Sequence, residues 1–275
     1  MSTTAMQPAD RVACDAVVDR IDGALPDGAV WGRILRAARG ESGSADAVAA
    51  PVYGPLVAGS PGRGLVIGQF GQSLDGRIAT PSGESKYLNG PGGLAHLHRL
   101  RALVDAVVVG VSTVAADDPM LTVRLVTGAN PARVVIDPRG RVDLAARMFA
   151  DDGARRVVVT AADSGLDPGP GIEVVRIAAV DGRLEPRAIV AGLAAIGLRR
   201  LLIEGGADTV SRFLAAGVLD RLHVAVAPVL VGGGRSGVVL PGVEGLADCL
   251  RPRIEVHRLG DDILFDCAFD AAGAR

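Results

Sequence analysis

Short apolar runs rich in Val, Ile and Leu alternate with segments of helical periodicity over most of the chain. The runs have the length of strands, and strands buried on both faces have this continuous apolar character. They are residues 65–70, 105–110, 133–137, 156–160, 173–177 and 201–203. Helical patterns lie at about 92–103, after Ser112-Thr113, at 186–197 and at 206–216. This alternation predicts an α/β fold with a mostly parallel central sheet flanked by helices.

Three further signals predict strands and turns outside that alternation. The long apolar run 222–231 predicts a strand that ends in Gly232-Gly233-Gly234. Residues 253–259 and 263–269 predict a closing antiparallel hairpin at the C-terminus. Near the start of the α/β region, Asp75-Gly76 stands between apolar positions and predicts a hairpin as well.

The first 60 residues carry one clear element, an amphipathic helix that must dock on the rest of the protein. Its apolar positions, at i, i+3, i+4 and i+7, are Trp31, Ile34, Leu35 and Ala38. We expect Trp31, the only tryptophan, to anchor this docking. Residues 41–44 favour a flexible link, and the Pro- and Gly-rich residues 51–64 favour a connector with a short strand at Val57. Two regions follow, an N-terminal helical appendage and linker (1–60) and a main domain (61–275).

Composition narrows the possible partners. Of 275 residues 49% are hydrophobic and only 3% aromatic, so aliphatic side chains must fill the core. A formal charge of −2 gives no electrostatic reason to expect nucleic acid or an acidic membrane surface as a partner. Cys14, Cys249 and Cys267 are scattered and odd in number, which favours reduced thiols over disulfides or zinc. With neither a signal-peptide pattern nor an apolar run of membrane-spanning length, we expect a cytoplasmic protein without membrane partners.

The stretch 201–214 is the most informative one. An apolar run ends at Glu204, Gly205-Gly206 follow, and a helical pattern begins with Val210, Phe213 and Leu214. Glycines permit a sharp turn and a close approach of a ligand, and the N–H groups of a helix N-terminus attract anions. This pattern predicts a phosphate cradle at the carboxyl end of a parallel strand. A tight strand–helix turn without a ligand is the alternative interpretation.

Familiar catalytic motifs are absent from the sequence. There is no Gly-x-Gly-x-x-Gly opening a helix after a strand, no Walker A sequence, no Gly-x-Ser-x-Gly elbow and no metal-ligand set, so we predict no metal. What remains are polar residues at the predicted strand ends, each of which could also be a turn former or a helix cap. They are Ser73, Asp75, Ser85, Lys86, Thr113, Asp117, Arg124 and Glu204. Because the ends of parallel strands share one edge of a sheet, we expect these residues to converge over one cleft.

The order of these motifs resembles the reductase domain of bacterial riboflavin-biosynthesis deaminase/reductases, the RibD C-terminal family. The resemblance covers roughly residues 65–270 and rests on the segments 73–79, 82–87, 109–119, 121–124, 135–138, 203–206 and 227–230. It implies a dihydrofolate-reductase-like fold, NADPH as cofactor and a homodimer. It also implies a reaction, the reduction of the ribosylamino group of a 5-amino-6-(5-phosphoribosylamino)pyrimidine to the ribitylamino group. In that reaction hydride passes from the nicotinamide to C1 of the ribose.

The resemblance further implies roles for individual residues. Cofactor contacts are expected at Gly71, Tyr87, Thr113, Asp117, Pro138, Gly206, Ala207, Asp208, Thr209, Val210, Ser211 and Arg212. Substrate contacts are expected at Gln69, Ser85, Arg101, Leu121, Arg124 and Glu204. Arg101 and Arg124 suit the 5′-phosphate, since guanidinium groups offer paired donors. Glu204 suits the ribose hydroxyls or a developing iminium carbon, and Glu204 and Asp75 are the expected catalytic residues.

Two departures from the family pattern affect the choice of substrate. The first 60 residues are too short for the family's deaminase domain and lack its His/Cys zinc pattern. Gln69 stands where bacterial members usually carry a lysine that faces the pyrimidine, which leaves open whether the deaminated or the undeaminated pyrimidine is reduced. Two alternatives remain: a reductase of the same fold acting on a pterin or another heterocyclic imine, and a non-catalytic nucleotide-binding protein.

Overall fold

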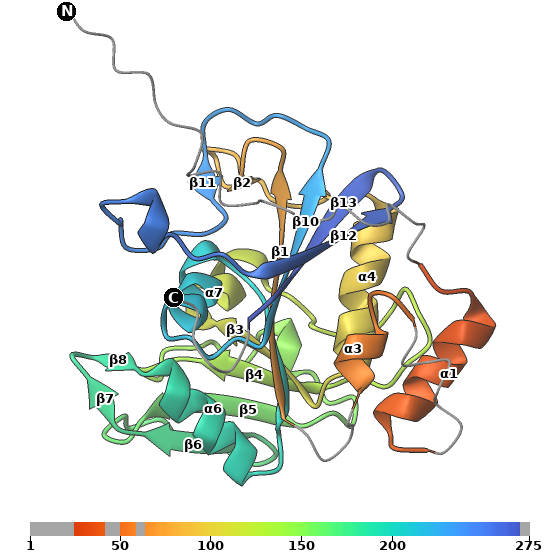
Figure 1. Ribbon diagram of the computed structural model, residues 1–275. Helices are drawn as coiled ribbons and strands as arrows, with labels where there is room; N and C mark the ends of the chain where they lie inside the picture. The colour runs from red at the N-terminus through yellow and green to blue at the C-terminus, as the bar shows by residue number, and fades with distance from the viewer. Residues whose placement is uncertain (1–24, 42–49, 59–63, 270–275) are drawn as a thin grey trace, which may run out of the picture.

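A nine-stranded sheet forms the centre of the protein in the computed structural model, which describes residues 25–41, 50–58 and 64–269 (Figure 1). The strand order is β12-β13-β10-β1-β9-β3-β4-β5-β6. The seven strands from β10 to β6 are parallel, and β13 and β12 continue the sheet as an antiparallel hairpin beside β10. The predicted α/β architecture, with its mostly parallel sheet and C-terminal hairpin, is confirmed.

The strands of the sheet have the following bounds: β1 Leu65–Ser73, β3 Ala106–Gly110, β4 Ala132–Ile136, β5 Arg156–Ala161, β6 Glu173–Ile177, β9 Arg200–Ile203, β10 Arg221–Ala227, β12 Arg253–Leu259 and β13 Asp262–Ala268. Two small antiparallel pairs stand apart, β2 Arg77–Ala79 with β11 Arg235–Ser236 and β7 Ala179–Val180 with β8 Arg183–Leu184. The helices are α1 Gly28–Ala38, α3 Gly54–Val57, α4 Pro91–Ala102, α5 Val111–Asp117, α6 Pro186–Ala195 and α7 Ala207–Ala215, with 3₁₀ turns at Arg147–Phe149 and Leu246–Asp248. Among the described residues, no helix is long and apolar enough to cross a membrane.

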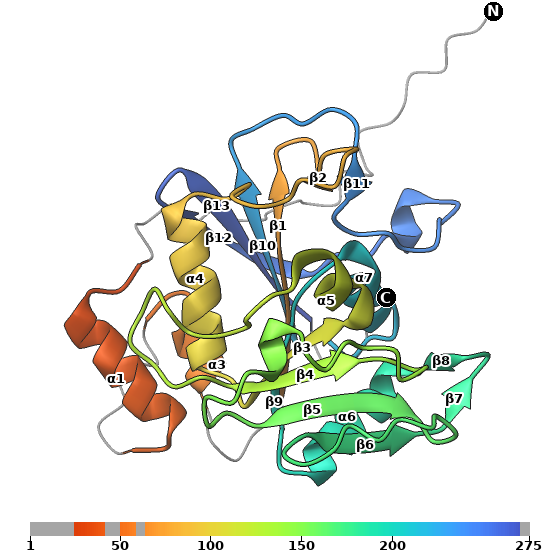
Figure 2. The same ribbon diagram turned by 180° about the vertical axis from the view of Figure 1, so that it is seen from behind.

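Helices cover both faces of the sheet, as the two opposite views show (Figures 1 and 2). On one face α6 and α7 pack against alternate strand residues such as Val108 and Ile203, which are fully buried. On the other face α4, with α1 and α3 beside it, covers Ile67 and Leu202. Further along that second face α5 covers Val107. Because side chains of a strand alternate between faces, the continuous apolar runs in the sequence supply both cores at once.

The N-terminal helix α1 begins at an N-cap, Asp27, whose carboxylate accepts the N–H of Val30 at 2.8 Å. Its apolar face is buried, and Trp31 is 4% exposed and packs edge-on against Tyr53. The prediction that Trp31 anchors this helix is confirmed. The predicted flexible link begins at Glu41, and its remaining residues, 42–44, lie outside the described residues.

Three local predictions were wrong. Val57 lies in the short helix α3 and not in a strand, because the turn 54–57 buries Leu56 and Val57 against the core. The Asp75-Gly76 turn exists, but β2 pairs with β11 and not with β1. The strand predicted over residues 222–231 is shorter than expected. It is β10, which ends at Ala227 because the next residue, Pro228, has no backbone N–H to donate to a neighbouring strand.

The β2–β11 ribbon is fixed by side chains at its base. Asp75 accepts hydrogen bonds from the backbone N–H groups of Val231 and Gly232 at 3.0 and 2.7 Å. Arg77 donates to the carbonyl of Gly232 and to Ser236 Oγ. Gly234 has φ +133°, and a Cβ there would lie 2.1 Å from the carbonyl oxygen of Ala79. Only glycine permits this approach, which explains one residue of the Gly232-Gly233-Gly234 run.

Candidate functional site

The carboxyl edge of the parallel strands collects most of the polar residues that the sequence singled out. Glu204 directly follows β9, and Thr113 lies in α5, directly after the neighbouring strand β3. Pro138 follows β4, the next strand along. Asp75 follows β1, which extends well beyond the end of β9. These four residues therefore lie along one edge of the sheet, although Asp75 stands apart at its far end.

The Gly205-Gly206 turn between β9 and α7 leaves no room for a side chain at its first glycine. Gly205 has φ +106°, and a Cβ there would lie 2.8 Å from Thr113 Oγ1. A Cβ on Gly110 would lie 2.7 Å from Thr209 Oγ1. The N–H of Gly206 donates to Thr113 Oγ1 at 3.3 Å. Two threonine hydroxyls thus line a turn made narrow by glycine, and such a turn is the geometry in which a helix N-terminus receives an anion.

The first turn of α7 is the part of the helix that faces this edge. The N–H groups of Ala207 and Asp208 have no acceptor within the helix, because they precede the first i→i−4 hydrogen bond. Three later members of the predicted cofactor segment use their side chains elsewhere. Val210 is fully buried in the core, Ser211 Oγ accepts the N–H of Val239, and Arg212 donates to the carbonyl of Leu184.

Arg101 and Glu204, both predicted substrate contacts, bind each other. Arg101 Nε and Nη2 donate to the two carboxylate oxygens of Glu204 at 2.8 and 2.7 Å, and Nη1 donates to the carbonyl of Thr122 at 3.0 Å. The side chains are only 8% and 7% exposed. Burial lowers the pKa of Arg101, but the adjacent carboxylate outweighs burial and leaves that pKa raised. The pair is thus a fixed, bidentate ion pair between α4 and the end of β9.

Arg124 lies next to this pair and keeps most of its donors. Its Nη1 donates to Thr122 Oγ1 at 2.9 Å, while the residue itself is exposed. Its backbone N–H donates to His98 Nδ1 at 2.9 Å. The loop that carries Arg124 is therefore bound to α4 through the side chain of His98. Burial, and then the charges of Arg101 and Arg124, lower the pKa of His98 to about 4. His98 is therefore neutral at pH 7, as an acceptor at Nδ1 must be.

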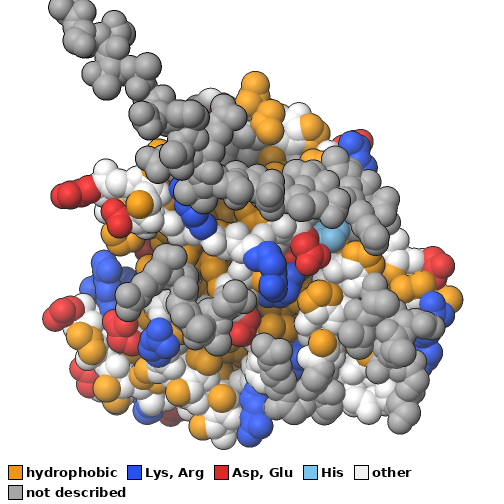
Figure 3. Space-filling view, viewed as in Figure 1, with side chains coloured by type: hydrophobic (Ala, Val, Ile, Leu, Met, Phe, Trp, Pro, Cys, Tyr) orange, Lys and Arg blue, Asp and Glu red, His pale blue; other side chains and the backbone are white. Residues whose placement is uncertain are grey.

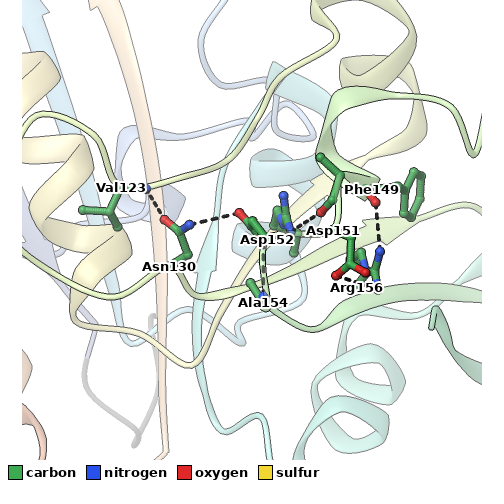
Figure 4. A network of polar contacts seen from close by, with 9 residues as sticks. Val123, Asn130, Phe149, Asp151, Asp152, Ala154 and Arg156 are labelled. Carbon is green, nitrogen blue, oxygen red and sulfur yellow. Dashed lines mark hydrogen bonds and ion pairs between the residues drawn. The ribbon is translucent and has the colours of Figure 1, made fainter.

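A polar network fixes the far end of the loop that carries Arg124. Asn130 accepts the N–H of Val123 at 2.8 Å and donates to Asp152 at 3.1 Å (Figure 4). Asp152 also accepts from Arg133, a β4 residue that is 1% exposed, and from the N–H of Ala154. The loop is consequently tied to β4 and to the connection before β5, as well as to α4.

Two predicted site residues have unusual backbone conformations. Leu121 has φ +55° and is 2% exposed, and Tyr87 has φ +61° and is 84% exposed. Side chains other than glycine rarely adopt positive φ, and such residues concentrate at functional sites. Asp118 is another, with φ +40°, directly after the predicted cofactor residue Asp117. Asp118 is also the C-cap of α5, where a left-handed residue commonly ends a helix.

The other predicted contacts are distributed around the same edge. Gln69 in β1 is 7% exposed, and Gly71, two residues later, packs so closely on Asn89 that a Cβ would lie 1.6 Å from Asn89 Oδ1. Ser85 is half-buried in the segment between β2 and α4, and Asp117 is exposed at the end of α5. Neither residue makes a side-chain hydrogen bond that the structure records among its described residues.

Asp75, predicted to be catalytic, has its carboxylate occupied by the protein itself. It accepts from Ser73 Oγ at 2.6 Å in addition to the two backbone N–H groups of the β10–β11 connection. The Ser73 hydroxyl, followed by these N–H groups, lowers the pKa of Asp75 to about 2. The geometry describes a residue that holds two loops together.

Sequence reasoning missed three residues of the site. His98 and Thr122 had no distinctive signal, because a helical histidine and a loop threonine are ordinary surface residues until the fold brings them to Arg124 and Arg101. Arg235 in β11 is the third. Its Nη1 lies 3.8 Å from the position that a Cβ on Gly206 would occupy. The sequence places Arg235 directly after Gly232-Gly233-Gly234, which was the available signal.

The glycine turn and the buried carboxylate–guanidinium pair lie at the carboxyl edge of an α/β sheet, which is where proteins of this class commonly bind ligands. Comparison with known proteins identifies the family. The chain belongs to the RibD C-terminal domain family, whose model matches residues 65–265.

Three relatives illustrate the match. The 2,5-diamino-6-ribosylamino-4(3H)-pyrimidinone 5′-phosphate reductase of Methanothermobacter thermautotrophicus is 33% identical over 215 residues, which are 74% of this chain and 97% of that protein. The riboflavin biosynthesis protein RibD of Aquifex aeolicus is 33% identical over 198 residues, 71% of this chain but only 55% of that protein. The structure of Acinetobacter baumannii RibD superimposes with a TM-score of 0.64 at 29% identity, covering 82% of this chain and 64% of that one. The chain therefore spans little more than half the length of the RibD proteins.

The buried pair makes a stability prediction. Glu204→Gln leaves the Arg101 charge buried without a counter-ion, and we expect it to lower the free energy of unfolding by about 3–5 kcal/mol. The double variant Arg101→Met/Glu204→Leu removes both charges, so it should cost much less than the sum of the single variants Arg101→Met and Glu204→Leu, which with the wild type complete the cycle. Urea denaturation of the four proteins measures the coupling. Single-variant losses below about 1 kcal/mol that add up in the double variant would show that the pair does not stabilise the fold.

His98 makes a pH prediction. Between pH 6.5 and about 4 the unfolded chain binds a proton at His98 that the folded protein does not bind, so stability falls as the pH is lowered through this range. The variant His98→Gln has no group that titrates at this position, while its amide oxygen can still accept the same N–H. As the pH is lowered through this range, we expect the free energy of unfolding of the wild type to fall by up to about 1.4 kcal/mol per pH unit more than that of the variant. Parallel unfolding curves at pH 7, 5.5 and 4.5 provide the measurement, and equal pH slopes would contradict the prediction.

Proposed function

We propose that the protein is an NADPH-dependent reductase that converts the ribosylamino group of a 5-amino-6-(5-phosphoribosylamino)pyrimidine to the ribitylamino group. The observation that carries the proposal is the Arg101–Glu204 pair beside the Gly205-Gly206 turn, in a chain of the RibD C-terminal family. The names of the relatives support the substrate class, since one of them is a ribosylamino-pyrimidinone phosphate reductase.

The cofactor fits the glycine turn. A Cβ on Gly205 would collide with Thr113 and a Cβ on Gly110 would collide with Thr209, so the two hydroxyls can lie where they do only because both positions are glycine. We assign its phosphates to the N–H groups of Ala207 and Asp208 and to the threonine hydroxyls. NADPH supplies hydride when bound. The chain's own contribution is to hold and orient the dinucleotide beside the buried pair.

Arg124 is the better of the two predicted phosphate ligands. Three of the five N–H groups of Arg101 are used inside the protein, two by Glu204 and one by Thr122. Arg124 uses only one, to Thr122 Oγ1. We therefore assign the substrate 5′-phosphate mainly to Arg124, with the remaining donors of Arg101 as support.

Glu204 is held as a carboxylate in a fixed orientation by Arg101. Each of its oxygens keeps a lone pair that can accept a ribose hydroxyl, and its negative charge can stabilise positive charge that develops at C1. Because the orientation is set before the substrate binds, little reorganisation is needed in the reaction. We assign no general acid.

The choice of pyrimidine depends on Gln69. Its amide is uncharged and can both donate and accept, so it suits a carbonyl or an amino substituent equally. The relatives include a reductase named for the diamino compound and RibD proteins. We propose the 5-aminouracil or its undeaminated diaminopyrimidinone analogue as the substrate, and a direct comparison of the two decides between them.

A cytoplasmic location and a homodimer complete the proposal. The described cysteines Cys249 and Cys267 are free thiols, which suits a reducing compartment. Large hydrophobic side chains are exposed in and around the β2–β11 end of the molecule. They are Leu74, Val229, Leu230, Val239, Leu240, Val243 and Leu246. Figure 3 shows hydrophobic surface at this end.

Sedimentation velocity tests the oligomer. We expect a species of twice the 28.0 kDa chain mass at micromolar concentration, because the exposed apolar surface is covered in a dimer. Leu230→Glu places a charge on this surface and should shift the population toward the monomer. A monomer at all concentrations would contradict the dimer.

An NADPH-oxidation assay tests the activity. With either pyrimidine as substrate, we expect turnover that Arg124→Ala weakens through a KM for the phosphorylated substrate raised roughly 10- to 100-fold, the equivalent of one or two charged hydrogen bonds. Glu204→Gln should lower kcat/KM by roughly 100-fold or more. Arg155→Ala, which removes an exposed arginine directly before β5, is the control and should leave both constants unchanged.

The rival functions give different results in the same assay. A substrate without the 5′-phosphate that is reduced as well as the phosphorylated one would favour a reductase of another heterocycle. NADPH binding without turnover of either pyrimidine would favour a non-catalytic protein.

A further inference from the structure

The N-terminal helices α1 and α3 precede the part of the chain that matches the family, which begins at residue 65. They are nevertheless part of the core that α4 shares with β1, and Trp31, Ile34, Tyr53 and Leu56 are all at most 4% exposed in it. Arg200 of β9 also donates to the carbonyl of Leu56.

Trp31 holds the loop that carries Arg124. Its indole Nε1 donates to the carbonyl of Thr127 at 2.7 Å, three residues beyond Arg124. The guanidinium of Arg99, on α4, lies 5.5 Å from the Trp31 ring centre and donates to the carbonyl of Pro26 at 3.3 Å. One side chain of α1 therefore contacts both α4 and the phosphate-binding loop.

Tyr53 is joined to α4 by a buried chain of polar groups. Its Oη lies 2.9 Å from His96 Nδ1, and His96 Nε2 lies 3.0 Å from His223 Nδ1. His223 Nε2 lies 3.1 Å from Asp266, which also accepts two hydrogen bonds from Arg221. Tyr53 and His96 are 1% and 0% exposed.

The Tyr53 hydroxyl is the end of this chain. Burial raises the pKa of Asp266, but His223 and Arg221 outweigh burial and hold that pKa well below its usual range. Burial strongly lowers the pKa of His96, so its ring is neutral, and one of its nitrogens donates while the other accepts. A hydroxyl can donate or accept, so Tyr53 pairs with His96 Nδ1 in either tautomer. Without the Tyr53 hydroxyl, His96 Nδ1 would lose the partner that the structure records for it.

Both contacts act on elements that carry the substrate residues. His96 lies five residues before Arg101 on α4, and His98, between them, binds the backbone of Arg124. We propose that Trp31 and Tyr53 are positioning residues of the reductase site, which hold Arg124 and Arg101 in place for the phosphorylated substrate. This inference rests on the proposed function. It makes the N-terminal segment part of the enzyme's substrate side and not a separate appendage.

Conservative variants of the full-length protein test the inference. Trp31→Phe keeps an aromatic ring but removes the indole N–H, and Tyr53→Phe removes only the hydroxyl. We expect each to raise the KM for the phosphorylated pyrimidine about threefold to tenfold, the equivalent of one hydrogen bond, with the KM for NADPH unchanged. The cofactor constant is the internal control, because the glycine turn belongs to β9 and α7 and not to the elements held by Trp31 and Tyr53.

Leu193→Ala is the control for stability. Leu193 is fully buried in α6, on the opposite face of the sheet, so this variant loses stability without touching the substrate side. It should leave the substrate KM unchanged at a temperature where all variants are folded. A substrate KM that is unchanged in Trp31→Phe and Tyr53→Phe, or that rises equally in Leu193→Ala, would overturn the inference.

A second readout is independent of activity. Hydrogen exchange followed by mass spectrometry should show faster exchange of residues 121–128 in Trp31→Phe than in the wild type and in Leu193→Ala. Absence of turnover in the wild type would defeat the proposed function, whatever the variants do. Unchanged exchange in Trp31→Phe would defeat the positioning role, even in an active enzyme.

Discussion

The ion pair between Arg101 and Glu204 is the interaction on which the site depends. Taking two charges out of water costs several kcal/mol per ion, and only good geometry offsets that cost. Here both carboxylate oxygens receive a donor, and a third donor of Arg101 reaches the carbonyl of Thr122. The pair therefore joins three elements, α4, the end of β9 and the loop after α5. Removal of either charge would leave the other one buried without a counter-ion.

This constraint explains why the surrounding loop is so firmly held. Thr122 is bound by Arg101 through its carbonyl and by Arg124 through its hydroxyl, so one residue links the buried guanidinium to the exposed one. Asn130 and Asp152 fix the loop from the side of β4 and β5 (Figure 4), and Trp31 fixes it from α1. These anchors hold the loop that carries Arg124 in one conformation, and a loop ordered in advance loses less entropy when a ligand binds to it.

Much of the fold was predictable because strands buried on both faces leave long apolar runs, and those runs determine strand and helix positions. The failures occurred where distant partners decide the structure. Asp75-Gly76 does form a turn, but Arg77 contacts Gly232 and Ser236, so β2 pairs with a strand more than 150 residues away. Likewise Glu204 was recognised from its own turn. Its bond to Arg101, 103 positions away in the sequence, could not be inferred from spacing.

In the predicted cofactor segment, 206–212, the sequence motif is longer than the part of the helix that faces the edge of the sheet. The motif places residues 206–212 together, but an α-helix turns by 100° per residue, and only its first turn faces the end of β9. Val210 belongs to the apolar face of this helix, so its side chain lies in the core, where it is fully buried. Ser211 and Arg212 bind Val239 and Leu184 instead. Helical periodicity, applied to the motif itself, thus separates the residues that can face a ligand, Gly206 to Thr209, from those that build the fold around them.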